Sequence, residues 1–203
     1  DVPNAKQSEI RIGYLGLPRT HPDFYATTIM NMKLGGNFSG DVNLILREEK
    51  GFTYGARTRF SGSRLPGTFT ASSGVRSNTT EESVNIFKNL MTAYRNPINE
   101  EDLTFTKNVT LKSNARQFET LGALRRMISN IATYDLPFNY IKDREDIVRN
   151  MTVDMHNELA RKFIRPDEMI YLVVGDAATQ LDGMQSLGFG DPILLDADGN
   201  SVE

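Results

Sequence analysis

The sequence predicts an α+β fold, a two-layer sandwich of a mainly antiparallel sheet with stacked helices. Three observations support this prediction. Apolar and polar residues alternate at residues 10–15 and again on both sides of a turn at 61–67, which indicates strands. Helical periodicity runs through residues 78–163, and a short apolar run at 169–174 predicts one more strand. The order strand, two helices, hairpin, helical block, strand favours helices packed on one sheet.

The chain has the length and composition of one globular domain. Its 203 residues are 39% hydrophobic, which is enough for a single core that we expect to span about residues 8–189, with a turn-rich tail at 190–203. The formal net charge of -3 gives no basic field for nucleic acid. The absence of cysteine excludes a thiolate nucleophile, and no apolar run approaches the roughly 20 residues of a membrane span.

The first strand is predicted at residues 10–15, where apolar and polar side chains alternate, and Pro18 ends it. We expect this strand to lie inside the sheet. His21 and Pro22 then mark the start of a helix, because proline is tolerated at the first helical position. The two glycines at 35–36 stop that helix.

The next stretch, LGGNFSGDVNLILREEKGFTY at residues 34–54, holds the candidate site. Ser39 is expected to cap a helix, because its oxygen can accept a hydrogen bond from the free amides of the first turn. Gly51 fits the left-handed residue that closes a helix. With Gly51 reversing the chain, Arg47 in the last helical turn and Tyr54 at the start of the next strand can converge on one side of the junction.

A hairpin is predicted because side chains at residues 52–60 alternate between two faces and a turn follows at residues 61–67. This alternation puts Tyr54 on the same face as Phe52 and Phe60. Four arginines lie on the opposite face or nearby, where they form either a basic wall that attracts acidic peptide or a solvated sheet face. They are Arg57, Arg59, Arg64 and Arg76.

Five helices are predicted after the hairpin, over about residues 80–94, 99–118, 121–134, 140–148 and 153–163. Asn78 and Glu81 resemble a capping box at the first of them. Thr152 is expected to cap the last. The side chains expected to face inward from that last helix are Met155, Leu159 and Phe163.

The final strand is expected in the centre of the sheet, because residues 169–174 are apolar on both faces. Residues 193–195 in the tail fit an edge strand.

The residues that could bind a metal are few. The chain has two histidines, His21 and His156, which lie far apart in sequence and outside any zinc-binding motif. A zinc hydrolase needs three protein ligands and an open position for water, so we predict no metal ligand in this chain. We interpret His156 as a residue of the polar helix face and His21 as a helix-start residue. No Gly-x-Ser-x-Gly elbow is present, and we predict no catalytic residue in this chain.

Two segments resemble a known family. Residues 34–56, LGGNFSGDVNLILREEKGFTYGA, combine a Gly-Gly turn, a serine-led helix, Leu-Arg-Glu, a glycine, and a tyrosine seven residues after the arginine. Together with MTVDMHNELARKFIRPDEMIYLVVGD at 151–176, this segment resembles the C-terminal domain of the insulinase and pitrilysin family of zinc metallopeptidases, which includes mitochondrial processing peptidase. The resemblance covers nearly the whole chain and implies the same α+β fold.

The resemblance implies a piece excised from a larger protein, with zinc in an absent N-terminal domain or partner subunit. It implies that Arg47 and Tyr54 bind substrate at that zinc. The expected partners are the N-terminal peptidase domain or a homologous partner subunit, and a peptide substrate held as an added strand on a sheet edge. From the residues alone, Arg47 can instead complement a helix C-terminus, and Tyr54 can belong to the core.

The resulting hypothesis is a noncatalytic, substrate-contacting C-terminal domain of a zinc-dependent endopeptidase of the insulinase family, acting on peptides. The alternative is a structural or peptide-binding subunit of the same fold with no peptidase activity, as in the core proteins of the respiratory cytochrome bc complex. Relatives from Gram-negative envelopes favour the periplasm over the cytoplasm. A His-x-x-Glu-His motif upstream would favour the first hypothesis.

Overall fold

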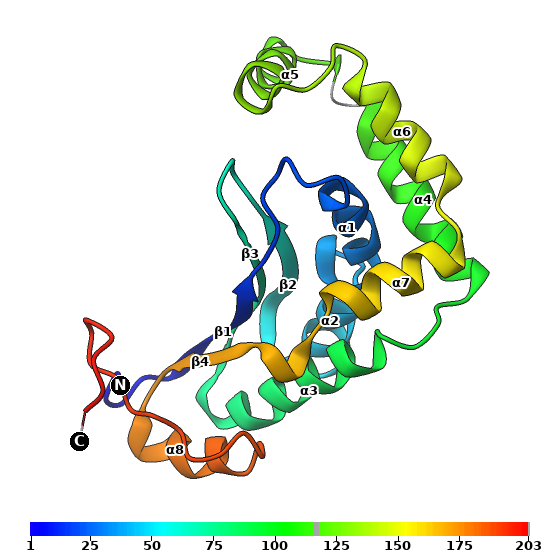
Figure 1. The fold of residues 1–203 in the computed structure, drawn as a ribbon. Helices are drawn as coiled ribbons and strands as arrows, with labels where there is room; N and C mark the ends of the chain where they lie inside the picture. Colours follow the sequence, from blue (N-terminus) through cyan, green and yellow to red (C-terminus); the bar gives the residue numbers. More distant parts are fainter. Residues whose placement is uncertain (116–117, 203) are drawn as a thin grey trace.

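A four-stranded antiparallel sheet forms the centre of the protein in a computed structural model that describes residues 1–115 and 118–202 (Figure 1). The strand order across the sheet is β2-β3-β1-β4. The predicted α+β sandwich with a mainly antiparallel sheet is confirmed. The strands are β1 (Gln7–Leu15), β2 (Thr53–Ser61), β3 (Thr68–Arg76) and β4 (Ile170–Val174).

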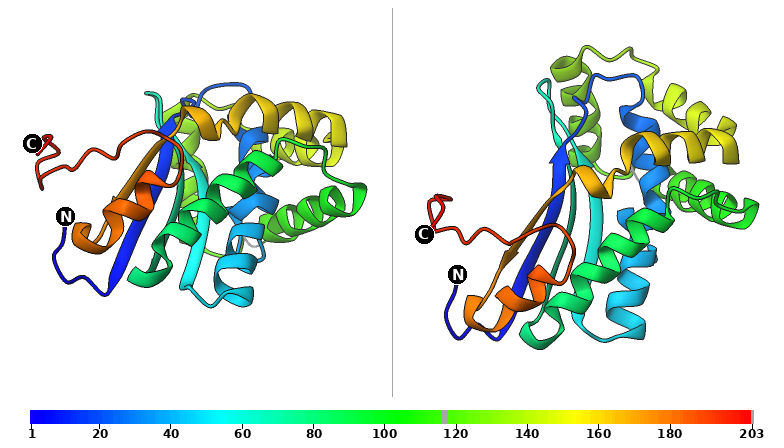
Figure 2. Two further views of the ribbon diagram at one scale, coloured as in Figure 1. Left: turned by 90° about the horizontal axis from the view of Figure 1, so that it is seen from below. Right: turned by 60° about the horizontal axis from the view of Figure 1, so that its bottom comes forward.

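The helices gather on one side of this sheet, α4 and α6 extend away from it, and α5 lies beyond the hairpin end of β2 and β3 (Figures 1 and 2). Two helices continue directly into wider π-helical turns, labelled η1 and η2. The helical elements before the hairpin are α1 (Phe24–Asn31), η1 (Met32–Gly36), α2 (Asp41–Asn43) and η2 (Leu44–Glu49). Those after it are α3 (Thr80–Ala93), α4 (Glu100–Ala115), α5 (Leu121–Tyr134), α6 (Tyr140–Asn150), α7 (Val153–Phe163) and α8 (Ala177–Gln185), with short 3-10 turns at Ser77–Thr79 and Pro166–Glu168.

The main core lies between the sheet and α1, α2 and α3. Every second residue of the strands points into it, because successive side chains of a strand face opposite sides of the sheet. Ile10 and Ile12 of β1 are fully buried there against apolar side chains of the helices, such as Phe87 of α3. A second, smaller cluster joins Ile29 of α1 to Val148 of α6, which holds the outer helices to the body of the domain.

The opposite face of the sheet is open. Strand register pairs Glu9 with Gly74 and Arg11 with Ser72, so these residues share that face. Ser72 in turn pairs with Arg57 of β2. On β1, β2 and β3 the open face therefore carries charged and small residues, whereas the covered face is mainly apolar.

The predicted positions of the first and the last strand in the sheet had different outcomes. β1 lies inside the sheet as expected, between β3 and β4. The prediction of a central last strand is wrong, because β4 has a neighbour on one side only. Its second apolar face is exposed, with Ile170 75% and Leu172 42% accessible to solvent. Both faces of β4 are apolar, but that pattern does not reveal how many neighbours the strand has.

Helix caps agree with the sequence only in part. Thr152 caps α7 as predicted, since its side chain accepts from the Met155 amide at 3.2 Å. Ser39 is not a cap, because Gly40 occupies that position and the Asn37 side chain accepts the Ser39 amide at 2.7 Å. Asn78 makes no capping bond, because it lies inside the 3-10 turn that precedes α3.

Of the three side chains predicted to face inward from α7, Phe163 is buried and Leu159 packs against the core, but Met155 does not face inward. Met155 is 45% exposed, whereas His156 is fully buried, so the interpretation of His156 as a polar-face residue is wrong. The buried stripe runs through His156, Ala160 and Phe163 at helical spacing. The His156 Nε2 atom lies 3.2 Å from the Tyr94 hydroxyl and 3.2 Å from the Met30 carbonyl oxygen, and burial lowers the pKa of this imidazole.

The tail does not add a strand to the sheet. Residues 193–195 form only an isolated bridge, between Leu195 and Ser201, and Ile193 is 74% exposed. The expected edge strand is therefore absent from the described sheet, because the tail folds back on itself.

Candidate functional site

The junction between η2 and β2 closes as the sequence predicts. Gly51 has a φ of 63°, in the left-handed region that glycine adopts without strain. The Lys50 amide donates to Ile45 five residues back at 3.0 Å, and the Phe52 amide donates to Leu46 at 2.9 Å. The first of these bonds spans five residues, as in a π-helical turn, a feature that is frequent at functional sites, and the second closes the end of the helix around Gly51.

The glycine-rich turn before this helix is a structural feature that depends on close packing. A Cβ atom on Gly35 would lie 2.6 Å from Val42 Cγ2 and 2.8 Å from the Thr58 nitrogen. A Cβ atom on Gly40 would lie 2.6 Å from the Cα atom of Gly35 itself. Only glycine at these positions lets the turn approach both the helix and β2 this closely.

A partly buried ion pair connects the same turn to its neighbours. Lys33 of η1 contacts Asp41 at the start of α2, and its Nζ also lies 3.6 Å from the carboxylate of Asp102 on α4. All three side chains are about three-quarters buried. Lys33 therefore links the turn to both α2 and α4.

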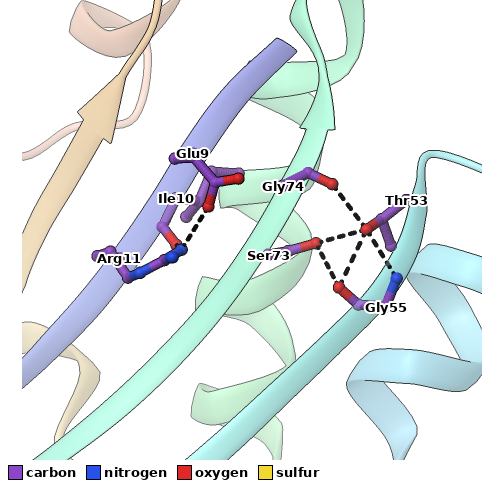
Figure 3. Close-up of polar contacts among 7 residues, drawn as sticks. All are labelled: Glu9, Ile10, Arg11, Thr53, Gly55, Ser73 and Gly74. Carbon is purple, nitrogen blue, oxygen red and sulfur yellow. Dashed lines mark hydrogen bonds and ion pairs between the residues drawn. The ribbon is translucent and has the colours of Figure 1, made fainter.

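β2 contains a bulge directly after the junction (Figure 3). Its pairing with β3 shifts between Thr53 and Ala56, so Gly55 loses its place in the ladder. Side-chain hydrogen bonds replace the backbone hydrogen bonds that the bulge removes from the pairing of β2 with β3. The Thr53 hydroxyl accepts from the Gly55 amide at 3.0 Å and donates to the Gly74 carbonyl at 2.7 Å, and Ser73 donates to the Gly55 carbonyl at 3.0 Å.

The bulge turns Tyr54 out of the strand pattern. Tyr54 is 93% exposed, so the alternative that it belongs to the core with Phe52 and Phe60 is wrong. A strict two-residue alternation cannot anticipate this, because a bulge inserts an extra residue. The signal that could have found it is Gly55, since a glycine inside a strand pattern often marks a bulge.

Tyr54 lines a hollow of about 470 Å³ that we call the bulge hollow. The open face of β1, β2 and β3 forms its base, and the glycine-rich turn forms its wall. It is lined by Glu9, Arg11, Gly35, Gly36, Asn37, Phe38, Asn43, Tyr54, Gly55, Ala56, Arg57, Ser72, Ser73 and Gly74.

Arg47 reaches this hollow through Phe38. The guanidinium carbon lies 4.5 Å from the centre of the Phe38 ring, and Phe38 lines the hollow with Tyr54. The Arg47 side chain is 35% exposed, and its Nε lies 3.5 Å from Glu48. Tyr54 therefore lines the hollow directly, whereas Arg47 is not one of its lining residues and contacts it only through the Phe38 ring.

The four arginines near the hairpin do not form one wall. Arg57 lines the bulge hollow, together with Arg11, which pairs with Glu9 at 2.8 Å (Figure 3). Arg59 lines a different hollow. The side chains of the other two are engaged elsewhere, with Arg64 2.9 Å from Asp135 and Arg76 donating to the Gly51 carbonyl at 3.2 Å.

Two buried asparagines, which sequence reasoning missed, hold the turn against β2. Asn43 donates to the Phe38 carbonyl at 2.7 Å and accepts from the Ala56 amide at 3.0 Å. Asn31 donates to the Thr58 carbonyl at 2.9 Å and accepts from the Thr58 hydroxyl at 2.7 Å. Their position on otherwise apolar helix faces was the available signal, because buried amides need partners.

Within residues 1–115 and 118–202, no group of three or more His, Asp or Glu side chains could hold a metal ion. No helix in this part of the chain is both long and apolar enough to cross a membrane.

The fold and the bulge hollow define a two-layer α+β domain with an open sheet face and a concave site beside its glycine-rich turn. Residues 1–110 match the family model of the peptidase M16 inactive domain. The match covers more than half of the chain, and the chain belongs to this family. The predicted resemblance is thereby confirmed. A search of curated proteins gives no match.

Solved structures show the same fold. The peptidase M16 inactive domain from Pseudomonas fluorescens is 22% identical, with a TM-score of 0.77 over 85% of this chain and 41% of that one. A chain of complex III2 from Candida albicans is 11% identical, with a TM-score of 0.72 over 91% and 46%. The inactive peptidase domain of a proposed zinc protease from Bordetella parapertussis is 14% identical, with a TM-score of 0.68 over 84% and 93%.

The coverage of these relatives differs. The chain spans about two fifths of the Pseudomonas structure, but nearly all of the Bordetella domain. The chain is therefore about as long as the inactive peptidase domain from Bordetella parapertussis.

Proposed function

We propose that this chain is the noncatalytic, substrate-contacting C-terminal domain of a zinc-dependent endopeptidase of the insulinase family, and that it acts on peptides through Arg47 and Tyr54. The observation that carries the proposal is the position of Tyr54. Its side chain is 93% exposed at a bulge and lines a hollow together with Phe38, the ring that the Arg47 guanidinium contacts. Membership of the M16 inactive-domain family supports the assignment.

The chemistry available at the bulge hollow is hydrogen-bond donation. A phenol and a guanidinium can both donate to a peptide carbonyl oxygen, and donors of this kind matter most where negative charge develops during cleavage. Arg47 is stacked on Phe38, which limits the orientations of its guanidinium before any peptide arrives. The exposed Tyr54 hydroxyl has no hydrogen-bond partner in the described part of the chain, so it is free to bind a group from outside.

Zinc would come from the absent N-terminal domain or a partner subunit. There it would supply a Lewis acid and an activated water. This chain would contribute the positioning of the peptide from the opposite side. The partner that covers the bulge hollow in this proposal is that N-terminal peptidase domain or a homologous subunit.

The sequence predicts that a peptide is held as an added strand on a sheet edge, but β2 offers few free backbone groups for this. An added strand requires free backbone groups on a sheet edge. On β2, the edge beside Tyr54, the Ala56 amide and the Thr58 carbonyl are already bound by asparagine side chains. β4 is the other edge of the sheet. We therefore propose that the bulge hollow contacts peptide through side chains, without adding a strand to β2.

Hydrogen exchange on the full-length protein tests this proposal. Zinc is first removed with a chelator so that a substrate peptide binds without being cut. We expect the peptide to slow exchange of the amides at residues 36–38 and 54–57. Protection confined to other parts of the chain would contradict a substrate-contacting role for the bulge hollow.

A structural or peptide-binding subunit without peptidase activity is the second candidate. The likeness to a chain of complex III2 over 91% of this chain favours it. The two candidates differ in the full-length protein. A His-x-x-Glu-His motif upstream and zinc-dependent cleavage of peptides support the first, whereas their absence, with the chain in a stable assembly, supports the second.

A further inference from the structure

A second hollow lies at the other end of β2, and we call it the arginine hollow. Its volume is about 260 Å³. Three arginines from three separate segments line it: Arg19 from the loop before α1, Arg59 from β2 and Arg144 from α6. The bulge hollow shares none of these residues.

No carboxylate balances these three charges within the described residues. Neighbouring cations are paired in the usual way, with Arg64 2.9 Å from Asp135 and Lys162 2.8 Å from Asp23. Arg19, Arg59 and Arg144 form no such ion pair in the part of the chain that the structure describes. Positive charges brought together without a counter-charge repel each other, so a bound anion would stabilise the arrangement.

Aromatic rings hold two of the guanidinium groups in place. Arg144 lies 4.8 Å from the centre of the Tyr25 ring and 4.7 Å from that of Tyr140. Arg19 lies 4.7 Å from the centre of the Tyr134 ring. Stacking covers the flat face of a guanidinium and leaves the N–H groups at its edge available for an anion.

The Arg19 guanidinium has an unused donor. Its Nε atom is buried and has no hydrogen-bond partner. Buried donors are normally satisfied, and each exception calls for an explanation. The Arg19 backbone amide is bound to the Ser63 carbonyl at 2.8 Å, so the loop that carries this side chain is fixed against the hairpin.

The electrostatic surroundings of Arg144 agree with this geometry. Burial lowers the pKa of the Arg144 guanidinium, and the charge of Arg19 acts in the same direction, while Tyr25 and Tyr140 oppose it. The two cations therefore influence each other directly. Thr28 and Ser61 also line the hollow, but their hydroxyl groups already bond to the Tyr25 carbonyl and to Thr68, which leaves the guanidinium groups as the donors for an anion.

We propose that the arginine hollow binds the phosphate group of a small anion through Arg19, Arg59 and Arg144. Three guanidinium groups suit a multiply charged tetrahedral oxyanion, because each presents a planar fork of donors to phosphate oxygens. The phosphate can be free inorganic phosphate or the terminal group of a nucleotide. This inference does not depend on peptide binding at the bulge hollow.

Calorimetric titration of the purified full chain in a phosphate-free buffer tests the proposal. The probes are inorganic phosphate, ATP and adenosine, all at constant ionic strength. We expect saturable binding of a phosphate-bearing probe at one site and no binding of adenosine. Binding of inorganic phosphate identifies a free-phosphate site, and binding of ATP alone identifies a nucleotide site.

Substitutions then locate the site. Arg144→Gln and Arg59→Gln should each weaken binding at least tenfold. Arg59 is exposed, so Arg59→Gln keeps the test valid if Arg144→Gln fails to fold. The matched control is Arg95→Gln, which removes one exposed arginine outside both hollows and should leave the affinity unchanged. Absence of saturable binding with both phosphate probes, or equal weakening by Arg95→Gln, would overturn the proposal.

Discussion

The guanidinium of Arg47 lies 4.5 Å from the centre of the Phe38 ring, at the edge of the hollow that Tyr54 lines. This stacking connects the last turn of a helix to a ring on the glycine-rich turn. Phe38 and Tyr54 line the same concave surface, so the cation contacts one lining residue and the phenol belongs to another. The proposed function depends on this relationship, because either group alone would be an ordinary surface residue.

Replacing Phe38 with alanine should weaken this arrangement without unfolding the domain. Phe38 is 66% exposed, so little core packing is lost. An exposed cation–π contact contributes about 0.5–1 kcal/mol, which corresponds to a fall of about two- to fivefold in kcat/KM. The measurement is cleavage of a fluorogenic peptide by the full-length protein. Leu65→Ala, at a 73% exposed position in the hairpin loop, is the control and should leave cleavage unchanged.

Asn43→Ala should destabilise the fold. The substitution leaves the Ala56 amide and the Phe38 carbonyl without their present partner. Buried groups left unpaired cost about 1–3 kcal/mol, measured as the free energy of unfolding in urea. Asn89→Ala, at an exposed position on α3, should stay within about 0.5 kcal/mol of the wild type. Equal effects of the two substitutions would show that Asn43 does not hold the turn.

Gly35→Ala tests whether close packing explains the glycine-rich turn. The new methyl group would lie 2.6 Å from Val42 and 2.8 Å from Thr58, so we expect a loss of about 1–3 kcal/mol in the free energy of unfolding. Gly122→Ala is the matched change on α5, where the nearest atom is 3.8 Å away. It should be neutral or stabilise by up to about 1 kcal/mol. A neutral Gly35→Ala would contradict the packing argument.

The buried His156 predicts a loss of stability in acid. Burial lowers its pKa from the ordinary value of 6.5, so below pH 6.5 the unfolded chain binds a proton that the folded chain does not. Stability should therefore fall as the pH drops below 6.5 and continue to fall until the folded pKa is reached. Urea unfolding at pH 7.5 and 5.0 measures the difference, and His156→Gln should reduce it. An unchanged pH dependence in His156→Gln would assign the effect to other groups.

The parts of the structure that follow from local sequence were predictable. Gly51 closes its helix and Thr152 caps α7, because these signals act between residues a few positions apart. Features that depend on residues far apart in the sequence could not be predicted in this way. The exposure of Tyr54 comes from a bulge against β3, and the burial of His156 comes from packing under α1. A sequence pattern predicts which face of a helix or strand is apolar, but it does not predict which neighbouring element covers that face.

Dependence on residues far apart in sequence also explains why the surroundings of the site and the position of the last strand could not be predicted. Arg47 and Tyr54 were selected from their positions around Gly51, yet only Tyr54 lines the bulge hollow, and the link of Arg47 to it depends on Phe38, whose carbonyl is held by Asn43. The arginine hollow joins three segments between residues 19 and 144, a distance that no local motif can span. β4 lies at the edge, although its composition resembles a central strand.

The most direct test of the substrate-contacting role is the kinetics of Tyr54→Phe in the full-length protein with zinc bound. This change removes only the hydroxyl group of a 93% exposed side chain, so folding should be unaffected. Phe138→Ala, at an equally exposed aromatic position, serves as the control. We predict that Tyr54→Phe lowers kcat for peptide cleavage by roughly 100- to 1,000-fold while Phe138→Ala stays near the wild type. A kcat for Tyr54→Phe within about twofold of the wild type would contradict the proposed role of the bulge hollow.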